Sequence, residues 1–299
     1  MPSRFLFALA AATALLTLQP VGAQDAAAPA AAPVSIDAAF EAYWAAPSVA
    51  EATSRAEAIL NTGVTFDDAF ARLKLGRTYT AQEPGIVLRT NRGRDGTTYH
   101  YDVYVPANYD PTRRYQVRLQ LHGALSRETN EPRGGAEEID PPDREQIYVL
   151  PYAWRDAPWW TERQVANLNA IVDTLKRTYN VDENLIVLSG HSDGGTGVYY
   201  IGMRETTRFA SFLPLNGYIM VLTWRGVDGR GLDDGAIFPN NLRNKPLFVV
   251  NGVKDPVYPI AVVEPFVKHL MKHGVDTAYH PQPNGEHDTA WWPEVKDAF

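Results

Sequence analysis

The sequence predicts an α/β protein with a mostly parallel sheet and helices on both of its faces. The first observation is that, beyond an opening pair of alternating strands, short apolar runs alternate along the chain with segments of helical periodicity. The second is the pentapeptide GHSDG at residues 190–194, which lies between an apolar run and a helix-compatible segment. Ligands of such sheets bind beyond the carboxyl ends of the strands, so functional residues are expected there.

The first 23 residues are typical of a signal peptide. Arg4 is the only charged residue among them, and residues 5–18 are largely apolar. This run is too short to span a bilayer comfortably, and the small residues at 21–23 favour cleavage after Ala23. An uncleaved anchor is the alternative. We therefore expect a secreted or periplasmic protein without stable membrane insertion after cleavage.

An alanine- and proline-rich leader and a helical extension are expected next. Residues 24–34 contain nothing with which to build a core, so they predict a flexible segment. Residues 35–80 predict three helices, of which the first begins at Ser35 and the others cover 49–60 and 66–73. The extension either adds stability or packs as a small cap, and the first interpretation is favoured.

Charge and cysteine content narrow the classes of function. The formal net charge is −7 and no cluster of lysine and arginine is present, which argues against a nucleic-acid partner. The chain has no cysteine, so disulfides and cysteine-type zinc sites are excluded. A chain of this size must then rely on its apolar core for stability.

The main domain is expected to span 81–299. It opens with an antiparallel hairpin, because 86–90 and 98–105 alternate with period two around a turn-rich segment. Further strands are expected at 115–121, 146–150, 184–188, 209–215, 246–251 and 275–280, and helices at 161–179, 196–205, 261–273 and 288–298.

Ser192 is the candidate nucleophile. It lies in a G-x-S-x-G pattern, which is weak alone but becomes specific when a strand precedes it and a helix follows. In such a tight turn, side chains at positions 190 and 194 would collide with neighbouring backbone, and the serine itself is strained so that its hydroxyl points outward.

A serine hydroxyl needs an adjacent base, and His287 is the candidate. It lies in a polar loop between the last strand and the last helix, where it can reach across to the serine. His280 is the rival, but it lies in or at the end of a strand. His269 and His273 are expected on a helix surface, and His191 is expected to support the turn.

The base in turn needs an acid, for which Asp255 is the candidate. It follows the strand at 246–251 and gives the chain order serine, aspartate, histidine. The alternatives are Asp233, Asp234 and Asp288.

Two backbone N–H groups are expected to form an oxyanion hole. One belongs to Asp193, directly after the candidate nucleophile. The other is expected from Ala124, where the preceding Gly123 allows the backbone to approach a substrate closely. An ordinary glycine between strand and loop is the alternative interpretation.

These motifs resemble the α/β-hydrolase superfamily, and more narrowly the secreted esterases that include polyhydroxybutyrate-depolymerase-like and feruloyl-esterase-like enzymes. The resemblance covers about residues 84–299 and is carried by Tyr104-Val105-Pro106, Tyr109-Asp110, Leu121-His122-Gly123, Asp182-Glu183-Asn184, Gly190 to Gly195, Asn251-Gly252, Asp255-Pro256 and Gly285-Glu286-His287. It implies a triad of Ser192, Asp255 and His287, a small-molecule or polymeric ester substrate, and no metal or organic cofactor. Asp193 departs from the apolar or amide residue of many relatives, and one expected consequence of its carboxylate is weaker binding of anionic substrates.

The loops at this edge of the sheet suggest how specificity arises. Aromatic residues gather there and either line a pocket for an aromatic or acyl group or pack in the core: Trp154, Trp159, Trp160, Tyr218, Trp224, Trp291 and Trp292. The glycine-rich stretch at 226–235 is either a lid or a plain surface loop, and the surface loop is favoured.

Two other functions compete with an esterase. A serine peptidase of the same fold would need a pocket for a peptide N-terminus; the sequence shows no clear acidic motif for one, and Glu131, Glu137 and Glu138 stay open as candidates. A non-catalytic binding protein is disfavoured because the serine, aspartate, histidine and oxyanion glycine are all present.

Overall fold

The computed structural model describes residues 34–126, 128–129, 145–223 and 237–299. Several sequence predictions lie outside these ranges: the signal peptide, nearly all of the leader, Glu131, Glu137, Glu138, Trp224, Asp233, Asp234 and the stretch at 226–235. The chain divides into two compact units between Arg77 and Thr78.

The N-terminal unit contains three helices, α1 (Ile36–Trp44), α2 (Val49–Asn61) and α3 (Phe66–Leu75). Each begins after a serine or threonine whose side-chain oxygen accepts a hydrogen bond from the backbone N–H three residues later. Such caps satisfy N–H groups that have no partner within the helix. The unit's own small core is formed by Ala39, Phe40 and Ile59.

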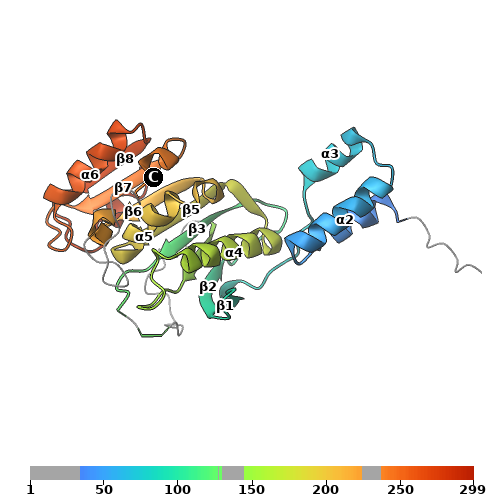
Figure 1. Cartoon of the computed structure of the whole chain (residues 1–299), viewed down its shortest axis with the longest axis horizontal. Helices are drawn as coiled ribbons and strands as arrows, with labels where there is room; N and C mark the ends of the chain where they lie inside the picture. The colour runs from blue at the N-terminus through green and yellow to red at the C-terminus, as the bar shows by residue number, and fades with distance from the viewer. Residues whose placement is uncertain (1–33, 127, 130–144, 224–236) are drawn as a thin grey trace, which may run out of the picture. The chain divides into compact units, whose positions relative to one another are not determined.

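The second unit is built on one eight-stranded sheet with the order β1-β2-β4-β3-β5-β6-β7-β8 (Figure 1). The strands are β1 (Gly85–Arg92), β2 (Thr98–Val105), β3 (Tyr115–Leu121), β4 (Gln146–Pro151), β5 (Val181–His191), β6 (Ser211–Leu215), β7 (Leu247–Gly252) and β8 (Thr277–Gln282). β2 runs opposite to the other seven strands of this sheet, so the expected mostly parallel sheet with an opening antiparallel hairpin is confirmed.

Alternate residues of the central strands serve two separate cores. Ile186 and Leu188 of β5 belong to the larger core, together with apolar residues of α4 (Glu162–Thr178), α5 (Asp193–Gly202) and α6 (Ile260–Lys272). Val187 lies in the other core, which Trp291, Trp292 and Val295 help to form near the C-terminus. The period of two along each strand therefore directs neighbouring side chains to opposite faces of the sheet.

The expected boundaries differ most from the structure at β5, α5 and α7. Strand β5 begins at Val181 rather than 184, and α5 begins directly after Ser192 rather than at 196. The last helix, α7, covers only Trp292–Val295 instead of 288–298. Pro293 explains this difference, because proline fits the first turn of a helix but would remove a hydrogen bond from the interior of a longer one.

The part of the chain that the structure describes contains no helix that could cross a membrane. None of its helices combines the length and the apolar character that a bilayer requires.

Candidate active site

Ser192 occupies a strained turn between β5 and α5. Its backbone has φ 56° and ψ −119°, a conformation that residues other than glycine rarely adopt. The turn is tight because its glycines lie against backbone. A Cβ atom on Gly194 would stand 2.0 Å from the carbonyl oxygen of Leu121, and one on Gly190 would stand 2.4 Å from the carbonyl group of Gly194. The collisions expected from the sequence are therefore present.

The structure brings Ser192, His287 and Asp255 together in one hydrogen-bonded chain. His287 Nε2 lies 2.8 Å from Ser192 Oγ, and His287 Nδ1 lies 2.7 Å from Asp255 Oδ2. A carboxylate only accepts hydrogen bonds, so it selects the imidazole tautomer whose proton is on Nδ1. Nε2 is then left with a lone pair that accepts the proton of the serine hydroxyl.

Asp255 is held by the backbone that follows it. Its side chain is fully buried, and its Oδ1 accepts hydrogen bonds from the N–H groups of Val257 at 2.7 Å and Tyr258 at 2.9 Å. Since these bonds use one carboxylate oxygen, the other is directed at the imidazole. Tyr258 also packs edge-on against the ring of His287, with centroids 5.4 Å apart.

The loop that carries His287 is tied to the sheet by Asn216, which sequence reasoning missed. The Asn216 side chain donates to the carbonyl oxygens of Glu286 at 3.1 Å and Asp288 at 2.8 Å, and its oxygen accepts from the N–H of Gly252 at 2.8 Å. Asn216 is fully buried and has φ 43°, which asparagine tolerates better than most residues. An Asn-Gly pair directly after an apolar strand is the signal that the sequence offered.

The predicted oxyanion loop lies against Ser192. A Cβ atom on Gly123 would stand 3.0 Å from the Cβ of Ser192, which accounts for glycine at this position. Ala124 is exposed and has φ 54°, so the chain turns sharply there. The carboxylate of Asp193 accepts a hydrogen bond of 3.0 Å from the N–H of Leu125. This carboxylate therefore joins the start of α5 to the loop.

A buried histidine supports the same loop from behind. His122 Nε2 accepts a hydrogen bond of 3.1 Å from the N–H of Ala153, which leaves Nδ1 to donate to the carbonyl oxygen of Gly123 at 2.7 Å. Trp159 donates from its indole N–H to the carbonyl oxygen of His122 at 2.9 Å. His122 belongs to the motif at 121–123, but the sequence pattern indicated no role for its side chain.

His191 lies beside His287, and its surroundings favour the neutral imidazole. Its ring centroid is 5.2 Å from that of His287. Burial, reinforced by this neighbouring imidazole, lowers the pKa of His191 to about 4. Its Nε2 is buried without a hydrogen-bond partner among the described residues.

The rival candidates lie away from Ser192 or contribute only backbone to the site. His280 stacks on Phe248 in the second core, with centroids 4.4 Å apart. His269 lies on α6, and His273 is the residue that caps its C-terminal end. The Asp288 carboxylate accepts from the N–H of Ala290 and so closes a local turn. Within the described residues, no three His, Asp or Glu side chains are grouped to hold a metal ion.

A hollow of about 810 Å³ lies over Ser192. Its lining residues are Ala124, Leu125, Arg155, Pro158, Trp160, Ser192, Asp193, Tyr218, Val221, Leu222, Val257, Tyr258, Pro259 and Val262. Among the tryptophans expected to line a pocket or pack in the core, Trp160 lines this hollow. Trp159 is fully buried, and Trp291 and Trp292 belong to the second core. The aromatic wall is completed by Tyr218 and by Tyr258, which the sequence analysis did not single out.

Comparison with known proteins identifies the fold. No family model matches the chain. A ferulic acid esterase superimposes with a TM-score of 0.55 at 19% identity, covering 71% of this chain and 95% of that one. Porphyromonas gingivalis dipeptidyl peptidase 4 superimposes with a TM-score of 0.56 at 12% identity, covering 73% and 35%. The chain thus has the α/β-hydrolase fold, as the sequence motifs suggested. An esterase and a peptidase match equally well, so the fold does not separate ester from amide chemistry.

One curated protein is similar in sequence. It is the bifunctional acetylxylan esterase/xylanase XynS20E of Neocallimastix patriciarum, 26% identical over 171 residues. The match covers 56% of this chain and only 23% of that protein.

Proposed function

We propose that this protein is a serine hydrolase that cleaves carboxylic esters through an acyl-enzyme. The observation that carries the proposal is the hydrogen-bonded chain from Asp255 through His287 to Ser192, directly beneath a hollow of substrate size. The similarity to an acetylxylan esterase and the fold shared with a ferulic acid esterase support an ester substrate.

In the first half-reaction, Ser192 Oγ attacks the ester carbonyl carbon while His287 Nε2 takes the hydroxyl proton. The N–H groups of Ala124 and Asp193 stabilise the oxyanion that forms, and each such donor typically contributes about 3 kcal/mol. The imidazolium, held by Asp255, then protonates the departing alcohol, which leaves the acyl group on Ser192.

In the second half-reaction, a water molecule attacks the acyl carbon and His287 takes one of its protons. Collapse of the second tetrahedral intermediate returns the proton to Ser192 Oγ and releases the carboxylic acid. Because Asp193 directs its carboxylate to the Leu125 N–H, its charge lies beside the oxyanion loop, and we infer that neutral acyl groups are preferred.

The test is hydrolysis of p-nitrophenyl acetate and butanoate by the wild-type protein and by Ser192→Ala. We expect the variant to lose at least about 10⁴-fold in kcat while it stays folded. Ser126→Ala is the matched control, since Ser126 is an exposed serine near the same loop. A fluorophosphonate probe should label the wild type and the control but not Ser192→Ala. Equal turnover by wild type and Ser192→Ala would reject the proposal.

A serine peptidase is the second candidate, because a dipeptidyl peptidase shares the fold equally well. The two are separated with an ester and an anilide of the same acyl group. An esterase turns over the ester alone, whereas a peptidase also releases the aniline, because its site catalyses the acylation step in which the amide bond breaks.

We further propose that residues 1–23 direct export and are removed. The N-terminal residue of the protein recovered from the periplasm or medium of an expressing bacterium is then Gln24. A protein that keeps Met1 in the membrane fraction would support the anchor instead.

A further inference from the structure

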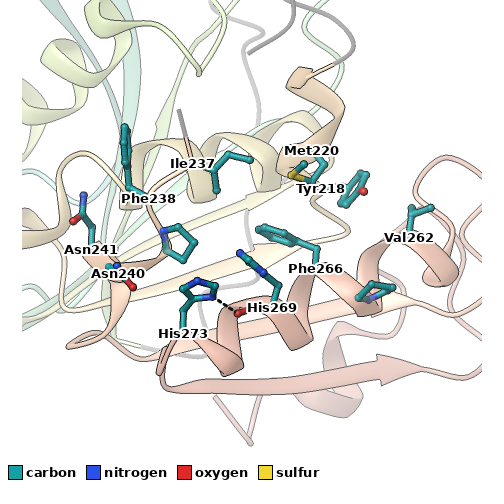
Figure 2. Close-up of a pocket in the computed structure, with 12 residues that line it drawn as sticks. Tyr218, Met220, Ile237, Phe238, Asn240, Asn241, Val262, Phe266, His269 and His273 are labelled. Carbon is teal, nitrogen blue, oxygen red and sulfur yellow. Dashed lines mark hydrogen bonds between the residues drawn. The ribbon is translucent and has the colours of Figure 1, made fainter. Parts of the chain in front are cut away.

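A second hollow lies along α6, beside the hollow over Ser192. It has a volume of about 730 Å³ and is lined mainly by apolar side chains (Figure 2). We call it the α6 groove and define it by Met220, Ile237, Phe238, Phe266, His269 and His273.

The two hollows adjoin each other, because Tyr218 and Val262 line both. Figure 2 shows these two residues and Met220 at one end of the α6 groove and Phe238 at the opposite end. A chain that leaves the neighbourhood of Ser192 on this side would pass Tyr218 and meet the Met220 end of the groove.

The groove is long because one helix face forms its wall. Val262, Phe266, His269 and His273 are spaced by four, three and four residues, which places them on the same side of α6. At about 1.5 Å of rise per residue, the wall from Val262 to His273 is about 16 Å long. An extended alkyl chain advances about 1.3 Å per methylene, given a C–C bond of about 1.5 Å, so about twelve methylenes fit.

The chemistry of the groove matches an uncharged, apolar occupant. Phe266 lies in the floor and is buried, while Met220 and Ile237 are half-buried. The described lining contains no aspartate, glutamate, lysine or arginine. Partial burial, together with the neighbouring His273, lowers the pKa of His269, so its imidazole is neutral at pH 7.

We propose that the α6 groove is a subsite for an elongated apolar chain of the ester substrate, on one side of the bond that Ser192 attacks. The inference rests on the proposed esterase function. It names the substrate class as esters with an apolar arm of about six to twelve carbons beyond the reacting carbonyl or the ester oxygen.

The experiment compares two substrate series, p-nitrophenyl esters from acetate to dodecanoate and alkyl acetates from ethyl to dodecyl. Complete burial of a methylene raises affinity about fourfold, so we expect about twofold for each methylene in this open groove. In one of the two series, kcat/KM should therefore rise at least tenfold between four and ten carbons. The series that responds identifies which side of the ester occupies the groove.

Two variants locate the chain. Met220→Glu places a charge near the entrance and should lower kcat/KM for the ten-carbon substrate at least tenfold, with acetate changed less than twofold. Phe238→Glu lies at the far end and should affect only the longest chains. Met271→Glu is the matched control, because Met271 is an exposed methionine of α6 that does not line the groove.

The results distinguish failure of the α6 groove as a subsite from failure of the proposed esterase activity. If neither series rises beyond four carbons, or if Met220→Glu lowers acetate and the ten-carbon substrate equally, the subsite is rejected while the esterase stands. If the wild type does not cleave p-nitrophenyl acetate, the esterase is rejected and the subsite with it. Phe238 is an exposed residue, so its variant still tests the groove should Met220→Glu fail to fold.

Discussion

Replacing Asp255 by asparagine separates the orienting role of its carboxylate from its role in folding. An asparagine carbonyl oxygen in the place of Oδ1 still accepts the N–H groups of Val257 and Tyr258. The amide nitrogen then faces His287 Nδ1, 2.7 Å from the present oxygen, and must donate to it. His287 is forced into the tautomer with its proton on Nε2, which cannot accept the serine proton.

We expect Asp255→Asn to lower kcat about 10⁴-fold, which corresponds to about 5 kcal/mol of transition-state stabilisation. Its free energy of unfolding should fall by only about 1–2 kcal/mol, because neutral hydrogen bonds replace charge-assisted ones. Asp255→Ala should be similarly inactive but less stable than Asp255→Asn, because it leaves the buried Tyr258 N–H without a partner at a cost of about 1–3 kcal/mol.

The assay is turnover of p-nitrophenyl butanoate, with Ser192→Ala as the background, and urea unfolding of the same samples. If folded Asp255→Asn retains more than a tenth of the wild-type kcat, the carboxylate does not select the tautomer and the reasoning is wrong. If Asp255→Ala is as stable as Asp255→Asn, the backbone bonds to Oδ1 do not contribute as described.

Three further predictions follow from the same geometry. Asp193→Ala should lower kcat/KM about tenfold, because it removes the acceptor of the Leu125 N–H. Asp193→Asn keeps an acceptor, so its kcat/KM should stay within about threefold of the wild-type value. Equal losses in the two variants would refute a role for this hydrogen bond. Gly194→Ala should cost about 3 kcal/mol or more in urea unfolding, or prevent folding, because its Cβ would meet the Leu121 oxygen at 2.0 Å. The pKa of His191 is about 4 in the folded protein and about 6.5 in the unfolded chain, so the unfolded chain takes up a proton first as the pH falls. The contribution of the neutral His191 to the free energy of unfolding is therefore complete above pH 6.5 and is lost as the pH falls towards 4. Between pH 7.5 and 4.5, the free energy of unfolding of His191→Gln should therefore fall by about 2–3 kcal/mol less than that of the wild type. An unchanged pH dependence would contradict the burial of a neutral imidazole.

The sequence predicted those parts of the molecule that depend on local pattern. Period-two alternation located the opening hairpin and short apolar runs located strands of the parallel part of the sheet. The glycines around Ser192 identified the turn because their spacing is a direct consequence of backbone crowding. Asp255 and His287 were found because each follows a strand in a known chain order. Their catalytic roles remain proposals for the variants above to test.

The remaining features depend on contacts between distant segments. The hydrogen bonds of Asn216 join the ends of three strands, and no periodicity within any one segment records them. The α6 groove combines residues near 220 and 240 with one helix face, so the sequence alone showed only an amphipathic helix. The last helix was predicted too long because the prediction followed its apolar residues and not Pro293. Proline is tolerated in the first turn of a helix, so α7 begins at Trp292.

Asn216 makes the loop around His287 tolerant of sequence change. All three of its partners are main-chain groups, so the attachment does not depend on the side chains at positions 286 and 288. Gly252 is the exception, since a Cβ there would meet the carbonyl oxygens of Gly285 and Glu286 at 2.4 Å. In proteins descended from this one, the side chains at positions 286 and 288 can therefore change without moving the His287 imidazole. Asn216 and Gly252 are the two residues whose replacement would alter its position.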